Sequence, residues 1–255
     1  MWFKRFSAVV FLLICTMLFL ICIKCNAQDF PFIKVKHDSF VSYYDTQTHN
    51  PALVVYQLEY SHFSGHAKVG NRHFKIDTQL PRPRVKDSDY TGTGYVRGHL
   101  CSAGDRDSDK AWLKETYYTS NLVPMTMVCN SGAWKVIEDS CRLLATRGHR
   151  LLIARGPLYD YTVNVLQDVI QKSAERHLKD TFIEIPDGFF CAVKCLDCRY
   201  RGFMVCCNTL SSVYYALLGS SVIQAPSYKQ DYRIAILLQN IIGTWSREVY
   251  ETTTR

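Results

Sequence analysis

The chain has 255 residues, of which 47% are hydrophobic and 21% charged, with a formal net charge of +7 at pH 7. This length suffices for one sizeable buried core, and the absence of repeated or low-complexity segments excludes a solenoid or a low-complexity protein. Without residues 1–27 the net charge is +4. That modest basic excess suits a polyanionic partner without requiring one.

The first 27 residues have the pattern of an export signal. Lys4 and Arg5 form a basic start, an apolar run covers residues 6–23, and Cys25 and Ala27 stand where signal peptidase reads small residues. The pattern predicts a signal peptide cleaved after Ala27, so that the remainder is secreted or periplasmic. Because the apolar run approaches the length that spans a bilayer, an uncleaved anchor is the alternative. Stable membrane association is expected only if the leader is retained.

Strands are predicted where apolar and β-branched residues form short runs. Between Asp29 and His49 we expect an irregular arm followed by a first strand, and after the turn at residues 91–94 we expect a short strand. Residues 112–118 lead into its partner strand, which ends near Asn121 and Pro124. The predicted strands cover residues 40–44, 51–60, 95–100, 150–156, 180–186, 189–194 and 203–208.

Two helices are predicted, one beginning around Asn130 and running past Arg142, and one over residues 228–242 that covers the sheet. The last residues, 252–255, form a frayed tail. The expected fold class is therefore α+β, with a central, mostly antiparallel sheet flanked by helices. We expect one domain over residues 28–255.

The first of these helices carries an unusual set of side chains. Asn130, Trp134, Glu138 and Arg142 recur every four residues, which places them on one slowly rotating face. Three of the four would need polar partners if they were buried, so a functional site explains the set better than a core does. Two local alternatives remain. Trp134 is more simply a packing residue than a base-stacking platform, and Glu138 and Arg142 have the spacing of an exposed ion pair.

Three motifs precede and overlap this helix. Residues 95–99 read Tyr-Val-Arg-Gly-His, residues 119–124 read Thr-Ser-Asn-Leu-Val-Pro, and residues 130–134 read Asn-Ser-Gly-Ala-Trp. Their order and spacing resemble the DNA/RNA non-specific endonucleases, a branch of the ββα-metal (His-Me finger) nucleases. The signature of that family is Asp-Arg-Gly-His, then Asn-x-x-Pro-Gln, then Asn-x-Gly-x-Trp-x-x-x-Glu. Val96 and Met125 replace the Asp and the Gln of the signature.

The resemblance implies an embedded ββα-metal finger and a Mg²⁺-dependent endonuclease, with Mn²⁺ as a substitute ion. His99 would be the general base that deprotonates water, because imidazole titrates near neutral pH. Asn130 would be the direct protein ligand of the metal, since Mg²⁺ keeps several of its waters, and Glu138 would act through a metal-bound water. The substrates would be DNA and RNA, cut with little sequence preference because none of these groups reads a base edge.

The remaining site residues follow by position from the same resemblance. Arg72, Arg97 and Arg142 would donate to the phosphate, and Asn121 would hold the base or the metal waters in place. Arg97 would also favour a neutral His99 if their side chains approach each other. Arg72 has the alternative of a solvated loop charge. At Gly98 the missing β-carbon would let a substrate backbone approach.

Two other functions are weighed against the nuclease. One is a nucleic-acid-binding pseudoenzyme of the same fold, which Val96 favours and which the retained base and metal ligand oppose. The other is a cysteine-rich interaction domain stabilised by zinc. Eight of the 11 cysteines follow the leader, and an even number favours disulfides of undeducible connectivity. A zinc site built from Cys195-x-x-Cys198 is disfavoured because Cys206 and Cys207 are adjacent. His149 and Arg155 are expected to be surface or ion-pair groups.

Overall fold

The structure is a computed structural model that describes residues 32–217, without 69–72, 160–176, 179–180, 200, 209–212 and the side chains of Phe203 and 213–217. These residues belong to one compact unit. The described helices include none that is long and apolar enough to cross a membrane. The predicted leader, the predicted helix at 228–242 and Arg72 lie outside the described residues.

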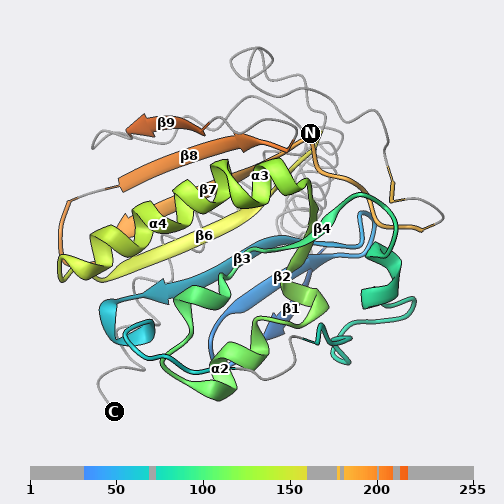
Figure 1. Cartoon of the computed structure of the whole chain (residues 1–255), viewed down its shortest axis with the longest axis horizontal. Helices are drawn as coiled ribbons and strands as arrows, with labels where there is room; N and C mark the ends of the chain where they lie inside the picture. Colours follow the sequence, from blue (N-terminus) through green and yellow to red (C-terminus); the bar gives the residue numbers. More distant parts are fainter. Residues whose placement is uncertain are drawn as a thin grey trace, which may run out of the picture. The chain divides into compact units, whose positions relative to one another are not determined.

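A seven-stranded antiparallel sheet forms the centre of this unit (Figure 1), in the order β1-β2-β3-β6-β7-β8-β9. The antiparallel α+β fold class is thus confirmed. The strands are β1 (Phe32–Lys36), β2 (Val41–Asp45), β3 (Asn50–Leu58), β6 (Leu151–Leu158), β7 (Gly188–Cys195), β8 (Arg201–Cys207) and β9 (Val213–Leu217). A separate two-stranded sheet pairs β4 (Val96–His99) with β5 (Leu122–Met125).

Most predicted strands are confirmed, and two predictions are wrong. Residues 32–36, expected to be irregular, form β1. Residues 180–186 were expected to form a strand, but the described part of this range, 181–186, contributes only an isolated bridge between His177 and Glu184. Their apolar character has another cause, because Ile183 and Ile185 are buried in a small cluster with Val85 and Tyr90. Burial in a loop therefore produced the strand-like pattern.

The described helices are α2 (Lys110–Glu115), α3 (Met127–Ser131) and α4 (Ala133–Thr146), together with short 3₁₀ turns η1 (Tyr60–His62), η2 (Asp87–Tyr90), η3 (Ala103–Asp105) and η4 (Thr119–Asn121). Residues 112–118, expected to lead into a strand, begin inside α2. The carboxylate of Asp109 caps α2 by accepting hydrogen bonds from the backbone N–H groups of Ala111 and Trp112.

The predicted single helix around Asn130 is in fact two helices. Gly132 interrupts them with φ −105° and ψ −102°, so Asn130 lies on α3 whereas Trp134, Glu138 and Arg142 lie on α4. The prediction that the four side chains share one helix face is therefore wrong. Only the three on α4 share a continuous helix.

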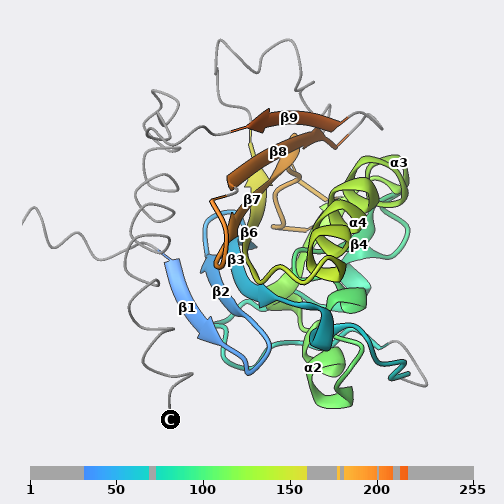
Figure 2. The same ribbon diagram turned by 90° about the vertical axis from the view of Figure 1, so that its left-hand side faces the viewer.

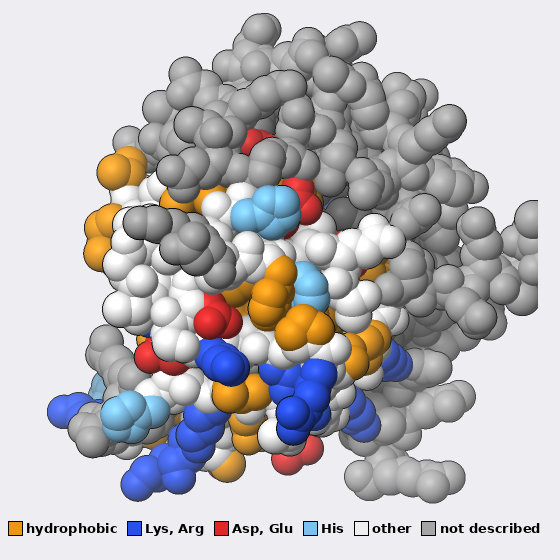
Figure 3. All heavy atoms as spheres, turned by 90° about the vertical axis from the view of Figure 1, so that its right-hand side faces the viewer, with side chains coloured by type: hydrophobic (Ala, Val, Ile, Leu, Met, Phe, Trp, Pro, Cys, Tyr) orange, Lys and Arg blue, Asp and Glu red, His pale blue; other side chains and the backbone are white. Residues whose placement is uncertain are grey.

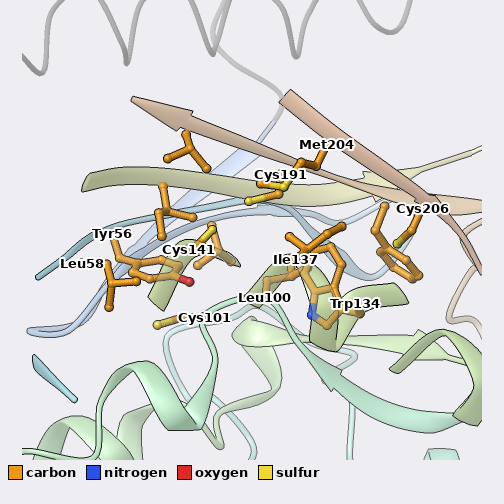
Figure 4. Packing of buried hydrophobic residues seen from close by; sticks show 14 of the residues in the cluster. Tyr56, Leu58, Leu100, Cys101, Trp134, Ile137, Cys141, Cys191, Met204 and Cys206 are labelled. Carbon is orange, nitrogen blue, oxygen red and sulfur yellow. The ribbon is translucent and has the colours of Figure 1, made fainter. Parts of the chain in front are cut away.

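The main core lies between α4 and one face of the large sheet (Figure 2). Trp134, Ile137 and Cys141 of α4 are buried against sheet residues that include Tyr56 and Cys191 (Figure 4). Burying a large apolar side chain stabilises a fold by about 1.5–3 kcal/mol. The opposite face of the sheet carries a second buried cluster that comprises Leu53, Val55, Leu152, Ala154, Phe190, Ala192 and Val205. Buried residues on both faces explain the continuous apolar runs in β3 and β6.

Candidate functional site

The hairpin of β4 and β5 and the helices behind it form the predicted strand-strand-helix unit. The two strands are antiparallel, with Arg97 opposite Pro124 and His99 opposite Leu122. The helix α3 follows β5 directly and packs against β4. The fold therefore brings together the elements that carry His99 and Asn130, which are 31 positions apart in the chain.

Trp134 fixes the position of the backbone at His99. Its indole Nε1 donates a hydrogen bond of 3.0 Å to the carbonyl oxygen of His99, and its side chain is buried against the ring of Phe189 at 5.6 Å between centroids. The interpretation of Trp134 as a packing residue is thus confirmed. Its hydrogen bond adds a direct link between α4 and the candidate base.

Asn121 holds the segment that follows His99. Its Nδ2 donates to the carbonyl oxygens of Cys101 at 2.9 Å and Thr116 at 2.8 Å, and its Oδ1 accepts from the N–H of Cys101 at 2.7 Å. The side chain is fully buried, and its backbone oxygen accepts a further bond from the N–H of Leu100 at 3.0 Å. Asn121 thus connects β4 to the chain that precedes β5.

Aromatic rings surround the half-buried imidazole of His99. The ring of Tyr117 meets it edge-on at 5.3 Å between centroids, and the ring of Phe74 lies at 5.7 Å. The guanidinium carbon of Arg97 lies 5.6 Å from the centre of that same Phe74 ring, so Phe74 contacts both side chains. Arg97 also donates to Asp87, from Nε to Oδ1 and from Nη2 to the backbone oxygen, both at 2.6 Å.

The position of Asn130 is set by the start of α3. Thr126 caps this helix by accepting from the N–H of Cys129 at 3.2 Å, and Asn208, which directly follows β8, accepts from the N–H of Thr126 at 2.8 Å. Asn208 also donates to the oxygen of Pro124 at 3.2 Å. Among the described residues, no hydrogen-bond partner holds the half-buried carboxamide of Asn130.

A carboxyl group and an arginine from α4 join a buried ionic network beside this helix. Arg142 Nη2 lies 3.6 Å from Glu138 Oε2. The two shorter contacts of Arg142, both 2.7 Å, go to Asp105 and Asp139. The Glu138–Arg142 ion pair expected as an alternative is present, but it is largely buried, because the two side chains are only 15% and 21% exposed.

Asp105 is the centre of this network, and no motif in the sequence pointed to it. Its carboxylate is fully buried and accepts a hydrogen bond of 2.7 Å from the hydroxyl of Tyr56. Arg155 Nη1 lies 3.6 Å from the same Oδ2 atom. Arg155 is itself fully buried, so its interpretation as an ion-pair group is confirmed and a surface position is excluded.

The network shifts the titration of its members in opposite directions. Burial raises the pKa of Glu138 above its ordinary value, and the Arg155 and Arg142 cations oppose this without cancelling it. For Arg142, burial lowers the pKa, but the attraction of Asp105 and the bond to Asp139 outweigh it, so the net pKa is raised. The guanidinium groups stay charged, whereas the Glu138 carboxyl holds a proton more readily than an exposed glutamate.

The structure corrects the interpretation of Gly98. A β-carbon at this buried position would lie 2.4 Å from both Cγ and Sδ of Met125, which is itself fully buried. The missing side chain therefore makes room for Met125 in the core, and a substrate cannot use that space.

The side of the molecule on which Figure 1 draws β4 carries basic side chains. Figure 3 shows Lys and Arg side chains gathered over the lower part of this face, next to hydrophobic and histidine side chains. A surface of this kind suits a polyanion. The predicted phosphate ligand Arg72 is outside the described residues, so its placement stays a prediction.

Comparison with known proteins gives a consistent result. A model of the family described as DNA/RNA non-specific endonuclease matches residues 28–230. Human "Nuclease EXOG, mitochondrial" is 34% identical over 116 residues, which cover 45% of this chain and 32% of that protein. "Nuclease" from Nostoc sp. is 33% identical over 129 residues, or 49% of this chain and 46% of that protein. The matches thus span less than half of these relatives' own length.

A solved structure shares the fold. A chain of the structure described as "Crystal structure of the EndoG/EndoGI complex: Mechanism of EndoG inhibition" superposes with a TM-score of 0.58 and 23% identity. The match covers 72% of this chain and 78% of that chain. At this identity the likeness supports the arrangement of sheet and helices alone.

Proposed function

Because the chain belongs to the DNA/RNA non-specific endonuclease family, we propose that it is a metal-dependent endonuclease that hydrolyses phosphodiester bonds of DNA and RNA with little sequence preference. The observation that supports this most is the fixed position of His99. Trp134 donates to its carbonyl oxygen, and Asn121 forms hydrogen bonds with the backbone of Cys101, two residues later. The helix α3 packs against the same strand and carries Asn130, whose carboxamide has no hydrogen-bond partner among the described residues.

His99 would remove a proton from the attacking water. Its carbonyl accepts from Trp134, and its ring lies against the edge of Tyr117 and the tilted ring of Phe74. Fixed placement matters because a general base contributes only if it lies within hydrogen-bond reach of the proton it takes. These contacts hold the half-buried imidazole in one orientation.

Asn130 would supply the direct protein ligand for the metal. The residues present fit Mg²⁺ or Mn²⁺, because the half-buried amide oxygen of Asn130, which has no hydrogen-bond partner among the described residues, is a hard donor. Water and substrate oxygens can fill the remaining positions. Glu138 would orient a metal-bound water. When bound, the metal would stabilise negative charge on the scissile phosphate and on the departing oxygen.

Arginines would neutralise the phosphate. Arg97 presents a planar guanidinium on the same strand as His99, and its bonds to Asp87 hold it in a partly exposed position. Arg142 has its shorter contacts with Asp105 and Asp139, so we propose that it mainly holds Glu138 and α4 in place. A phosphate contact by Arg142 and one by Arg72 stay predictions.

The test is cleavage of supercoiled plasmid and of single-stranded RNA by the purified chain, with Mg²⁺ or with EDTA. Both substrates should be degraded in Mg²⁺ only. His99→Ala should lower the rate by about 10²–10⁴-fold, as expected for loss of a general base, and Asn130→Ala should raise the Mg²⁺ concentration required. His66→Ala changes an exposed histidine and is the matched control. Binding of DNA without cleavage by the unaltered chain would contradict the proposal and favour a nucleic-acid-binding pseudoenzyme.

We also propose that the catalytic unit acts outside the cytoplasm. The leader pattern of residues 1–27 supports this, as does the disulfide between Cys195 and Cys198, because disulfides are rare in reducing compartments. Human "Nuclease EXOG, mitochondrial", named above, is a contrast, because its name places it in an organelle. Expression of the full chain with a C-terminal tag, followed by N-terminal sequencing of protein from the medium, should find a start at Gln28. Retention of the intact leader inside the cell would contradict export.

A further inference from the structure

A second cluster of possible metal ligands lies away from the candidate active site. His149 precedes β6, Cys195 ends β7, and Asp197 and Cys198 belong to the turn between β7 and β8. Figure 1 shows this turn at the end of the sheet beside the C-terminal end of α4, whereas β4 lies toward the opposite end of that helix. The proposed nuclease mechanism uses none of these four residues.

The four side chains converge on one point. One ligand atom from each, the imidazole nitrogen, two sulfurs and a carboxylate oxygen, all lie within 4.8 Å of one another. His149 Nδ1 lies 3.5 Å from Asp197 Oδ1 and 3.9 Å from Cys195 Sγ. Ligand atoms around a tetrahedral zinc ion are separated by roughly 3.3–3.8 Å, as follows from metal–ligand bonds of about 2.0–2.3 Å. The two His149 distances are close to that geometry, whereas the two sulfurs are bonded to each other and would have to separate on reduction.

The backbone holds these residues independently of any ion. Cys195 is paired with Leu151 across β6 and β7, and the N–H of Leu196 donates to the oxygen of Arg150 at 2.8 Å. The N–H of Arg150 donates to Asp197 Oδ2 at 3.1 Å. That bond leaves Oδ1 directed toward the sulfur and the imidazole, so little ordering entropy would be lost on binding.

The disulfide and dithiol states of Cys195 and Cys198 differ in the hydrogens and charges that their sulfurs can carry. Cys195 and Cys198 form a disulfide, in which neither sulfur carries a hydrogen. Cys195 Sγ and Asp197 Oδ1, 2.8 Å apart, then meet as two acceptors. In the dithiol state a proton or a cation between them would replace this repulsion with attraction.

We propose that, when the Cys195–Cys198 disulfide is reduced, these two thiolates bind one Zn²⁺ ion together with His149 and Asp197. Zinc accepts sulfur, nitrogen and carboxylate ligands in tetrahedral sites, and its cysteine ligands often have the C-x-x-C spacing seen here. Mg²⁺ and Ca²⁺ prefer oxygen ligands, so the metal proposed at Asn130 would not compete. Cys198 and Asp197 are exposed, which gives the ion a path from solvent.

The chemistry balances with an external dithiol as reductant. The dithiol passes two electrons and two protons to the Cys195–Cys198 bond and becomes a disulfide itself. Two thiols form, and each loses its proton when Zn²⁺ binds. Oxidation by a disulfide reverses these steps and releases the ion.

The partner pair considered from the sequence, Cys206 and Cys207, does not take part. Both are fully buried, with Cys206 Sγ at 3.7 Å from Cys129 Sγ and the thiol of Cys207 donating to the oxygen of Asp187 at 3.6 Å. In the described part of the chain, the metal-binding group found around Cys195 contains neither of them. His149 and Asp197 provide the second half of the site instead.

The test uses the purified full chain, stripped of metal and kept reduced with a phosphine. Titration with Co²⁺ should give one equivalent of a site with thiolate-to-cobalt charge-transfer absorption, and Zn²⁺ should displace it. His149→Ala and Cys198→Ser should each weaken binding by at least about tenfold, the lower end of the range for perturbed metal sites. Asn130→Ala and His177→Ala should leave the absorption unchanged. The oxidised chain should give no such band.

A second measurement keeps the test decisive if a variant fails to fold. With the unaltered, reduced chain, Zn²⁺ should protect Cys195 and Cys198 from alkylation, as read by peptide mass spectrometry, while Mg²⁺ should not. Absence of the thiolate band in the reduced chain would overturn the proposal. So would an undiminished band in both His149→Ala and Cys198→Ser, or protection of other cysteines only. None of these outcomes depends on nuclease activity.

Discussion

The indole of Trp134 donates its hydrogen bond to the backbone carbonyl of His99, over 3.0 Å. This bond joins the first turn of α4 to the last residue of β4. Trp134 thus has a physical role that does not involve stacking on a base. The helix that carries Glu138 and the strand that carries the candidate base cannot move independently without breaking this contact.

Trp134→Phe should separate positioning from packing. The phenyl ring keeps much of the contact with Phe189 but leaves the His99 carbonyl without its donor, which costs about 1–3 kcal/mol if no water replaces it. We expect kcat on plasmid DNA to fall by more than the lower free energy of unfolding alone would produce. Cleavage assays measure the first quantity and urea denaturation measures the second. Trp112→Phe, on the partly exposed α2, is the matched control. Equal activity in the two variants would contradict the positioning role.

Asn121→Ala should lower the free energy of unfolding more than Trp134→Phe does. It leaves the oxygens of Cys101 and Thr116 and the N–H of Cys101 without partners in a fully buried place, and each such group costs about 1–3 kcal/mol. We expect a loss of at least about 2 kcal/mol in the free energy of unfolding, from urea denaturation. Asn121→Asp restores the acceptor but not the donor, so it should not rescue. If the free energy of unfolding fell by no more than in typical surface substitutions, the hydrogen bonds of Asn121 would not be what holds these segments together.

Two carboxylates contact Arg142 at the same distance of 2.7 Å but differ in burial, which gives a matched pair of variants. Asp105→Asn removes the buried anion that Arg142 shares with the fully buried Arg155, and breaking a buried pair costs about 3–5 kcal/mol. Asp139 is 51% exposed, so Asp139→Asn should cost less than about 1 kcal/mol. Urea midpoints at neutral pH measure both. Equal losses would mean that burial does not decide the strength of this network.

The contrast between Asp105 and Asn121 shows what the sequence could predict. Asn121 stands inside a motif whose resemblance to the family signature implied that it holds the base or the metal waters in place. Asp105 follows β4 in a short 3₁₀ turn, and its partners Tyr56 and Arg155 come from β3 and β6. A contact between residues so distant in the chain leaves no local periodicity, so only the folded chain reveals it.

The four-residue repeat of polar side chains led to a wrong prediction of one continuous helix. Gly132 lies within the polar repeat of four residues, yet its backbone angles divide the predicted helix, and so the repeat overestimated what one helix face presents. The strands β3, β6, β7 and β8 were predictable because buried strands require continuous apolar runs. Phe74 lies in the segment whose resemblance to the family assigned Arg72, but no role was predicted for it, because its contact with both His99 and Arg97 depends on a chain path that the sequence does not specify.

Glu138→Gln should reveal the raised pKa of Glu138 through the pH dependence of stability. The ordinary value is 4.5, and the folded value is higher because of burial. Between the two values the folded chain binds more protons than the unfolded chain, so this group lowers stability as pH rises through that window. The variant should therefore gain stability relative to the unaltered chain as pH rises from 4.5. Urea midpoints at several pH values measure the difference, and a difference independent of pH would contradict the raised pKa. In nuclease assays at neutral pH the variant should be less active.

Gly98→Ala tests whether the missing β-carbon serves packing or substrate approach. The new carbon would lie 2.4 Å from two atoms of the buried Met125 side chain, and overpacking of this kind costs about 1–3 kcal/mol. Met125→Ala should remove the clash, because the space needed by the new methyl group is then free. A double-mutant cycle should therefore give a favourable coupling of about 0.5–3 kcal/mol, with the double variant more stable than the sum of the single losses predicts. If Gly98 instead faced the substrate, the single variant would keep its stability and lose activity, and Met125→Ala would not restore either. The measurement thus decides whether Met125, which stands where the family usually has Gln, has become part of the core behind the candidate base.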